Sequence, residues 1–269
     1  MSHNEVTIEV MGGLGNQLFQ IFTLISYAIK YNKKFYIENR KASNINRPFY
    51  WDNILQAMKP FIREPVNVPI YQERQFSYKE LLNIKSKFKL YGYFQSHKYF
   101  YDKSETIIKM LGFNEMKKKI DFDPKNKVSL HFRIGDYINI QNCHPVQKIS
   151  YYENCIKQLI KDTKKDNWEI IYFYEISDEK TIDKHINHLK NMFNNIVFTP
   201  VNHKLSDWEQ MLTMSLCQHN IIANSTFSWW GAYLNNNDNI VYYPNTWFGE
   251  TFKDKNVVDL FPIEWKKIH

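Results

Sequence analysis

The chain has 269 residues, of which 43% are hydrophobic and 23% are charged, values typical of a globular protein that exclude a largely disordered chain. Its formal net charge of +7 comes from lysines spread along the chain, which fits anionic small-molecule ligands or a lysine-rich coding bias. These lysines lack a nucleic-acid-binding signature and no apolar run is long enough to cross a membrane, so we expect no nucleic acid partner and no membrane span.

Apolar runs alternate with segments of helical periodicity along the first half of the chain. We expect strands at residues 6–11, 35–37 and 89–93, and helices at residues 17–31, 78–84 and 98–111. Residues 40–69 are rich in proline and predict mostly loop with one short helix.

The second half repeats this alternation. We expect strands at residues 128–132, 169–174, 196–198, 220–223 and 240–243, and helices at residues 150–161, 178–193, 208–217 and 227–234. The charged segment 117–127 is the expected boundary between domains 1–120 and 121–269. The alternation predicts an α/β fold of two doubly wound, Rossmann-like domains facing a cleft.

The first candidate site is a glycine-rich turn, Gly-Gly-Leu-Gly-Asn-Gln at residues 12–17, between a predicted strand and a predicted helix. Glycines allow close approach of a ligand to the backbone, and a helix N-terminus favours an anion. The alternative is a tight turn in which Asn16 caps the helix. The candidate ligand-binding residues are Gly13, Gly15, Asn16 and Gln17.

The second candidate site is His-Phe-Arg-Ile-Gly-Asp-Tyr at residues 131–137, which follows an apolar strand. His131 and Arg133 are candidate donor-binding residues, because strand alternation places them on one face, where the arginine could bind a diphosphate and stabilise its charge as it leaves. Asp136 could orient Arg133, accept a proton or cap the next segment. The alternative for Arg133 is a structural ion pair with Asp136.

The third candidate site is Asn-Ser-Thr-Phe-Ser-Trp-Trp-Gly at residues 224–231, between a strand and a short helix. Hydroxyl groups at a helix start can cap the helix or bind phosphate. We expect Trp229 and Trp230 in the core. The candidate ligand-binding residues are Asn224, Ser225, Thr226, Phe227 and Ser228.

The three stretches together, GGLGNQLFQ at 12–20, HFRIGDY at 131–137 and HNIIANSTFSWWGAYL at 219–234, resemble the signature sequences of the α-1,2-fucosyltransferase family. They occur in the family's order, and the resemblance extends over essentially the whole chain. It implies a GT-B architecture and a GDP-fucose donor held mainly by the C-terminal half, with inversion at the anomeric carbon.

The resemblance also implies roles for individual residues. Arg133 is similar by position to the arginine that contacts the donor diphosphate. Gly15 and Asn16 resemble a loop beside the donor's phosphates and sugar. Ser225, Thr226 and Phe227 match a segment that contacts phosphate and nucleoside.

Two positions depart from the family pattern. Ile134 stands where a second arginine is usual, and alternation points it away from Arg133. Gln210 stands where the wider group has a carboxylate that reads guanine, with Glu209 and Asp207 close by as further base-reading candidates. An amide satisfies the paired N–H groups of guanine only partly.

The sequence therefore predicts an inverting, metal-independent glycosyltransferase, an α-1,2-fucosyltransferase that moves L-fucose from GDP-fucose to a glycan hydroxyl without a cofactor. Asp136 and His144 are the candidates for the base, whereas Asp121 and Asp123 are expected in a solvated loop rather than at a metal. One alternative is a transferase for another GDP-sugar or a UDP-deoxysugar. Another is a non-catalytic carbohydrate-binding protein.

The three cysteines are widely spaced and odd in number, so they predict neither a disulfide framework nor a metal site. With no visible signal peptide, we expect a cytoplasmic location and leave peripheral membrane association open. Residues 40–75, the expected acceptor loops, carry no motif that names the acceptor glycan or the oligomeric state.

Overall fold

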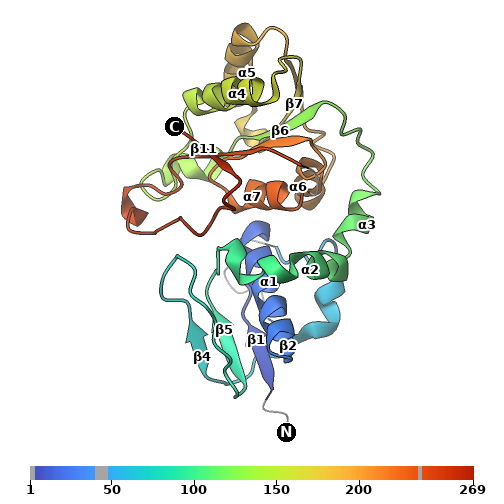
Figure 1. The fold of residues 1–269 in the computed structure, drawn as a ribbon, viewed down its shortest axis with the longest axis vertical. Helices are drawn as coiled ribbons and strands as arrows, with labels where there is room; N and C mark the ends of the chain where they lie inside the picture. The colour runs from blue at the N-terminus through green and yellow to red at the C-terminus, as the bar shows by residue number, and fades with distance from the viewer. Residues whose placement is uncertain (1–3, 40–47, 236–237) are drawn as a thin grey trace. The chain divides into compact units, whose positions relative to one another are not determined.

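The structure, a computed structural model, describes residues 4–39, 48–235 and 238–269. The chain forms two compact α/β units, coloured blue to green and green to red in Figure 1. Unit 1 comprises Met1–Lys119 and Lys255–Pro262, and unit 2 comprises Ile120–Asp254 and Ile263–His269. Parallel sheets in both units confirm the predicted fold class.

Unit 1 contains a five-stranded sheet in the order β3-β2-β1-β5-β4. Its strands, which pair in parallel, are β1 (Glu5–Ile8), β2 (Lys34–Glu38), β3 (Ile62–Arg63), β4 (Ile70–Gln72) and β5 (Phe88–Tyr91). The short strands β3 and β4 were not predicted, because two or three residues are too few to show a period. Both lie at the sheet edges.

Helix α1 (Leu14–Lys30) packs on β1 and β2 and is buried around most of its circumference (Figure 1). Phe22 is fully buried in it and meets Phe100 edge-on at 5.2 Å between ring centroids. Helix α2 (Ser104–Leu111) covers α1, and the left-handed Gly112, with φ of 75°, separates α2 from α3 (Phe113–Lys117). The central helix is thus enclosed by its own unit.

Two predicted helices of unit 1 differ from the structure. Residues 98–111 begin as two 3-10 turns, His97–Tyr99 and Tyr101–Lys103, and become α-helical only at Ser104. Within the expected loop of residues 40–69, the short helix is the 3-10 segment Gln56–Phe61, while residues 40–47 lie outside the described residues.

The predicted helix at residues 78–84 is wrong, since this segment has no regular secondary structure. The Tyr27 hydroxyl accepts a hydrogen bond from the Ile84 amide at 2.9 Å and donates one to the Leu82 carbonyl at 2.9 Å. Lys30 forms an ion pair with Glu80 at 2.9 Å. Side chains of α1 therefore satisfy backbone groups that a helix would have paired internally.

Unit 2 contains a six-stranded parallel sheet in the order β11-β10-β9-β6-β7-β8. Its strands are β6 (Lys127–His131), β7 (Glu169–Phe173), β8 (Val197–Pro200), β9 (His219–Ile221), β10 (Val241–Pro244) and β11 (Lys266–Ile268). Its helices are α4 (Ile149–Thr163), α5 (Glu179–Met192), α6 (Asp207–Met214) and α7 (Thr226–Tyr233). These helices and the first five strands were predicted, whereas the three-residue β11 was not.

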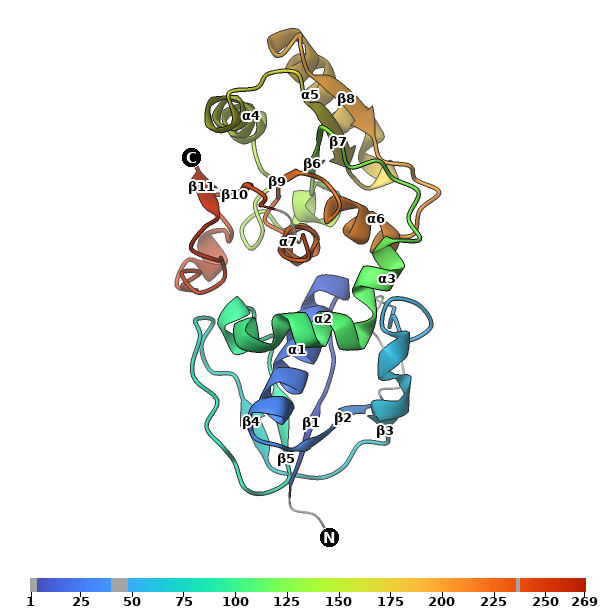
Figure 2. The same cartoon turned by 45° about the vertical axis from the view of Figure 1, so that its right-hand side comes forward.

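The helices cover both faces of the second sheet. Figure 2 shows α4 and α5 on one face and α6 and α7 on the other. On the α4 and α5 face, Val128, Leu130 and Ile170 of the sheet join Ile156 and Ile186 of the helices in one buried cluster. This is the doubly wound arrangement that alternating strands and helices predict.

In each sheet the first strand has later strands of the chain on both sides, so the order of strands reverses at one point. In unit 1 the reversal lies between β1 and β5, and in unit 2 it lies between β6 and β9. Ligands of open parallel sheets bind outside the carboxyl ends of the strands at such a reversal. The glycine turn follows β1, and the second and third motifs follow β6 and β9, so all three predicted motifs leave strands at these points.

The segment Lys255–Pro262 belongs to unit 1, whereas the sequence placed it in domain 121–269. Asp259 holds it there, because its carboxylate accepts a hydrogen bond from the Tyr78 amide at 3.0 Å and forms an ion pair with Lys98. The Ser96 hydroxyl also donates to the Asp259 carbonyl at 2.6 Å. These contacts join residues far apart in the sequence, so no local pattern could reveal them.

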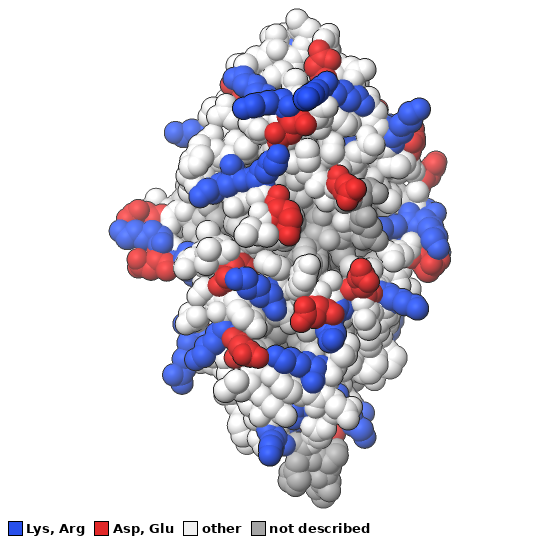
Figure 3. All heavy atoms as spheres, in the orientation of Figure 1, with Lys and Arg blue, Asp and Glu red and all other residues white. Residues whose placement is uncertain are grey.

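Within the described ranges, no helix is both long and apolar enough to cross a bilayer. Figure 3 shows lysine and arginine side chains interspersed with aspartate and glutamate on the face that it displays. On this one face, the mixture differs from the continuous basic stripe by which proteins bind nucleic acid.

Candidate functional site

The glycine turn of unit 1 depends on Gly12. Its φ is +83°, and a Cβ atom there would lie 2.7 Å from Nδ2 of Asn16. At Gly13, which caps α1 with φ of −73°, the corresponding position is open space. The turn therefore needs glycine at residue 12, while at residue 13 it leaves room beside the start of α1.

Two glutamines of α1 hold this turn. Gln17 is buried and donates from Nε2 to the carbonyls of Gly12 and Pro48, both at 2.9 Å. Gln20 is also buried and bonds both backbone groups of Met11, at 3.1 and 2.7 Å. The Gln17 amide group thus supports the turn from within, and its contact with a donor stays a prediction.

Gly15 and Asn16 lie in the first turn of α1, directly after the glycine turn. Asn16 accepts a hydrogen bond from Gln95 at 2.8 Å, and Gln95 follows β5 across the reversal of the sheet. Gly15 is buried in the first turn of the helix. The predicted capping of α1 by Asn16 is wrong, because Gly13 is the N-cap residue.

Replacing Gly12 with alanine should lower the free energy of unfolding by about 1–3 kcal/mol, because the residue must keep a left-handed φ and crowd Asn16. Gly13→Ala is the matched control and should cost less than about 1 kcal/mol, from a weaker helix cap. Urea unfolding of both variants measures the difference. Equal losses would contradict this account of the turn.

In unit 2, Arg133 lies just beyond the end of β6, with 16% of its side chain exposed. Its Nη2 donates to Oδ1 of Asp136 at 2.7 Å, and its Nη1 bonds Oε1 of Glu175. The predicted ion pair with Asp136 is therefore present, and Glu175 is a second partner. Both carboxylates are about half exposed, at 44% and 48%, so the largely covered guanidinium pairs with groups that reach the surface.

Gly135 fits closely against the loop that follows β7. Its amide donates to Oδ2 of Asp178 at 2.8 Å, and a Cβ atom on it would lie 2.7 Å from Oε2 of Glu175. Glycine thus allows Glu175 to approach the chain beside Arg133. Asp178 in turn fixes the start of the short helix that carries Asp136.

His131 ends β6 with only 6% of its surface exposed, and its ring lies 5.6 Å from that of Phe227. Burial, together with the smaller effect of the nearby charge of Arg133, lowers the pKa of His131 to about 3. The imidazole is therefore neutral at physiological pH. It can shape the floor of a site but adds no positive charge for phosphate.

This burial predicts a pH dependence of stability. As pH falls from about 6.5 toward 3, the unfolded chain takes up a proton at His131 that the folded protein excludes, so folding weakens. His131→Gln should remove up to about 1.4 kcal/mol of this loss per pH unit. Urea unfolding of both proteins across this range checks the slope, and equal slopes would contradict the buried neutral ring.

The third motif begins α7. Ser225 is the N-cap residue, and its hydroxyl accepts a hydrogen bond from the Phe227 amide at 3.3 Å. Thr226 and Phe227 are half-buried, and Phe227 packs against a small core cluster formed by Ile171, Phe173, Val201 and Met214. Ser228 is buried, with its hydroxyl bonded to the Ala223 and Ser225 carbonyls. Ser228 thus supports the start of α7, and its contact with a donor stays a prediction.

Asn224 links the second and third motifs. Its side chain donates to the carbonyls of Pro145 and Trp247, at 2.9 and 3.1 Å, and its own carbonyl accepts from the Tyr137 hydroxyl at 3.1 Å. The Arg133 cation lies 5.2 Å from the Tyr137 ring centroid. The arginine loop and the start of α7 are thus joined through one tyrosine.

The predicted base-reading residues lie at the start of α6. The Glu209 carboxylate accepts from the amide and hydroxyl of Ser206, at 2.8 and 2.6 Å. Gln210 donates to the Leu205 carbonyl at 3.0 Å. Glu209 and Gln210 therefore support the N-terminus of α6, whereas Asp207 is exposed.

The other two sequence candidates have ordinary surroundings. The His144 ring stacks on Tyr137 at 5.0 Å and lies against Phe248 and Phe252. Asp123 accepts from the Lys125 amide at 3.0 Å, as a loop residue does. Among the residues that the structure describes, no group of three or more His, Cys, Asp or Glu could hold a metal ion.

The structure therefore brings together the second and third motifs at the reversal of the second sheet. That the glycine turn of unit 1 serves the same ligand stays a prediction. Sequence reasoning missed Glu175 and Asp178 beside Arg133, and Gln95 beside Asn16. Each of them follows a strand next to a motif-bearing strand, so examining the carboxyl end of every strand would have found them.

Comparison with known proteins identifies the family. The model of glycosyl transferase family 11 matches residues 5–269. An α-1,2-colitosyltransferase of Escherichia coli is 26% identical, with 98% of both chains covered. The O-antigen biosynthesis glycosyltransferase WbnK of Escherichia coli is 32% identical over 66% of this chain and 61% of its own length. A galactoside 2-α-L-fucosyltransferase of Caenorhabditis elegans is 26% identical over 98% of this chain and 79% of its own.

Solved structures show the same architecture at low identity. Heptosyltransferase II of Escherichia coli superposes with a TM-score of 0.52 at 8% identity, covering 98% of this chain and 90% of that one. A family 9 glycosyl transferase of Veillonella parvula gives 0.50 at 8% identity, covering 100% and 87%. The two parallel-sheet α/β units are those of a GT-B glycosyltransferase. By the family match over nearly its whole length, the chain belongs to glycosyl transferase family 11.

Proposed function

We propose that the protein is an inverting α-1,2-fucosyltransferase, which transfers L-fucose from GDP-fucose to a hydroxyl of a glycan and needs no metal. The observation that carries this proposal is Arg133, a partly exposed guanidinium at the reversal of the second sheet and next to the start of α7. Guanidinium groups bind diphosphates by paired hydrogen bonds, and a helix N-terminus adds further N–H donors. The donor is therefore held by unit 2.

In the reaction, the acceptor hydroxyl oxygen attacks the anomeric carbon from the face opposite the diphosphate. The bond between that carbon and the phosphate oxygen breaks, and its electron pair leaves with GDP. Arg133 stabilises this charge, and N–H groups at the start of α7 assist, because preorganised donors act most strongly where charge develops. These groups take the part that a divalent ion plays in other transferases.

The hydroxyl proton passes to a carboxylate or to water. Asp136 is half-exposed and forms an ion pair with Arg133, which makes it the candidate base of this chain. Its pairing with the guanidinium also suits it to orient Arg133. His144 is less suitable, because its ring is stacked against three aromatic side chains.

A second donor is favoured by two observations. A relative that covers 98% of this chain is named a colitosyltransferase. Gln210 stands at the place of the guanine-reading carboxylate, and its side chain donates to a backbone carbonyl. The exposed carboxylate at the start of α6 is that of Asp207. Transfer of colitose from its nucleotide-activated form is therefore the alternative to fucose.

A nucleotide panel tests the donor class. GDP, UDP and dTDP are compared by thermal shift and calorimetry, with EDTA present throughout. We expect GDP alone to bind, and at about 100 times its Kd to stabilise the fold by about 2.7 kcal/mol. Preference for UDP or dTDP would overturn the GDP-sugar proposal, and loss of transfer in EDTA would overturn metal independence. Transfer assays with fucose and colitose donors then decide the sugar.

The cysteines support a proposal for the compartment in which the protein acts. Cys143, Cys155 and Cys217 are free thiols, and burial raises the pKa of Cys155 and Cys217. Reducing conditions preserve such thiols, so we propose that the protein acts in the cytoplasm.

A further inference from the structure

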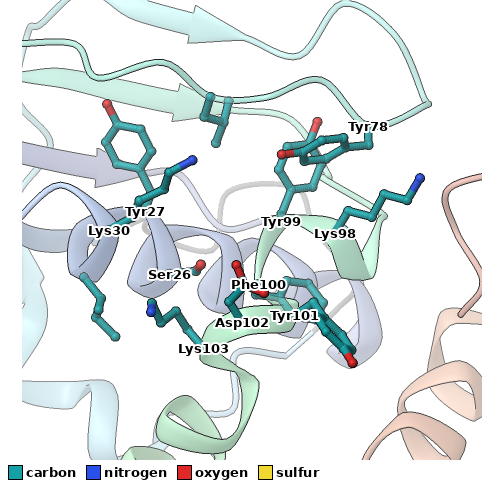
Figure 4. Close-up of a pocket in the computed structure, with 12 residues that line it drawn as sticks. Ser26, Tyr27, Lys30, Tyr78, Lys98, Tyr99, Phe100, Tyr101, Asp102 and Lys103 are labelled. Carbon is teal, nitrogen blue, oxygen red and sulfur yellow. The ribbon is translucent and has the colours of Figure 1, made fainter.

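Unit 1 contains a pocket that is separate from the glycine turn (Figure 4). Its volume is about 330 Å³, within the range of small-molecule sites. The residues that line it include Tyr27, Tyr78, Tyr99, Phe100 and Tyr101. Five of the twelve lining residues are aromatic, and among them the partly or largely exposed Tyr78, Tyr99 and Tyr101 offer apolar ring faces edged by polar groups.

Hydrogen bonds of the Tyr27 and Tyr99 hydroxyls fix the backbone segment beside this pocket. Tyr27 bonds both Leu82 and Ile84, and the Tyr99 hydroxyl accepts from the Lys79 amide at 3.2 Å. Tyr78 and Tyr99 contact each other at 4.9 Å between ring centroids. The irregular segment 78–84 is thereby fixed in place, so the rings are positioned before a ligand arrives.

The charges at the rim are paired. Lys30 forms an ion pair with Glu80 at 2.9 Å, and Lys98 forms one with Asp259. Asp102 and Lys103 add one charge of each sign. A rim of balanced charges offers both donors and acceptors, which suits neutral hydroxyl groups better than phosphate or sulfate.

The pocket lies at the far end of α1 from the glycine turn. Ser26 and Lys30 line it, whereas the helix starts at Leu14. Twelve to sixteen residues of α-helix correspond to about 18–24 Å. A ligand in the pocket is therefore well separated from a sugar held at the glycine turn.

We propose that this pocket binds a neutral saccharide unit of the acceptor glycan, remote from the hydroxyl that reacts. The inference rests on the proposed function for the identity of the ligand as an acceptor. Pyranose rings present C–H groups on one face, which pack on the negative face of a tyrosine ring. Tyr101 is 65% exposed and is the ring most available for such stacking. Long acceptors would then bind more tightly than short ones.

Tyr101→Ala tests the site without disturbing the core, since this side chain is largely exposed. Tyr101→Phe keeps the ring and should bind as the unchanged protein does. Tyr93→Ala, on a tyrosine that is 40% exposed and outside the pocket lining, is the matched control. The probes are lactose, the longer galactose-terminated lacto-N-neotetraose, and an array of neutral, sialylated and sulfated oligosaccharides.

We expect the unchanged protein to bind long neutral glycans more tightly than lactose, and Tyr101→Ala to lose about three- to tenfold of that affinity. Undiminished binding by Tyr101→Ala, preference for sulfated glycans only, or no binding to any probe would overturn the inference. GDP affinity is measured on the same samples. GDP binding without glycan binding would reject the pocket alone, and glycan binding without GDP binding would reject the proposed function alone.

Discussion

Arg133→Ala will lower kcat/KM for glycosyl transfer by about 100- to 1000-fold, the usual loss when one preorganised charge-stabilising donor is removed. The side chain meets two half-exposed carboxylates, whose surface ion pairs add only about 0–1 kcal/mol to stability. The fold should therefore survive the substitution. Steady-state kinetics with the donor that binds in the nucleotide panel, together with urea unfolding, measure both effects.

The matched control for this variant is Lys190→Ala, which removes one positive charge from an exposed position at the end of α5. It should leave GDP affinity and turnover unchanged, which separates a specific contact from the overall charge of the protein. Near-normal turnover in Arg133→Ala would remove the proposed role of the guanidinium.

Glu175→Gln distinguishes a ligand-binding arginine from a structural one. If Arg133 serves the fold, losing its Glu175 partner should weaken stability as much as losing the arginine does. If Arg133 serves a diphosphate, Glu175→Gln should keep GDP binding or strengthen it, because one competing negative charge is gone. Urea unfolding of Glu175→Gln and Arg133→Ala tests the structural role. Calorimetric titration of Glu175→Gln with GDP tests the diphosphate role.

Trp229→Ala will lower the free energy of unfolding by about 3–5 kcal/mol, as removal of a large buried aromatic side chain does. Trp229 is fully buried, stacks on Tyr233 at 4.7 Å and contacts Trp265 at 5.4 Å. That loss is a large part of the stability of a typical domain. Urea unfolding measures it directly.

The control for this second substitution is Trp208→Ala, at a half-buried tryptophan in the first turn of α6. Its loss should be clearly smaller, because less apolar surface leaves the interior. Equal losses for the two tryptophans would contradict the assignment of Trp229 to the core of unit 2.

The sequence alone determined the alternation of strands and helices, the two parallel sheets and the burial of Trp229 and Trp230, because periodicity and apolar runs are local properties. It also placed Arg133 and Ser225 at the carboxyl ends of strands, where such sheets bind ligands. These inferences need only neighbouring residues.

The tertiary structure decided the rest. Glu175 reaches Arg133 across 42 positions of sequence, Tyr27 prevents a helix at residues 78–84, and Asp259 returns its segment to unit 1. In each case a side chain bonds to a partner that no local window contains. Such pairings depend on how the strands are ordered in space, so only the folded chain could reveal them.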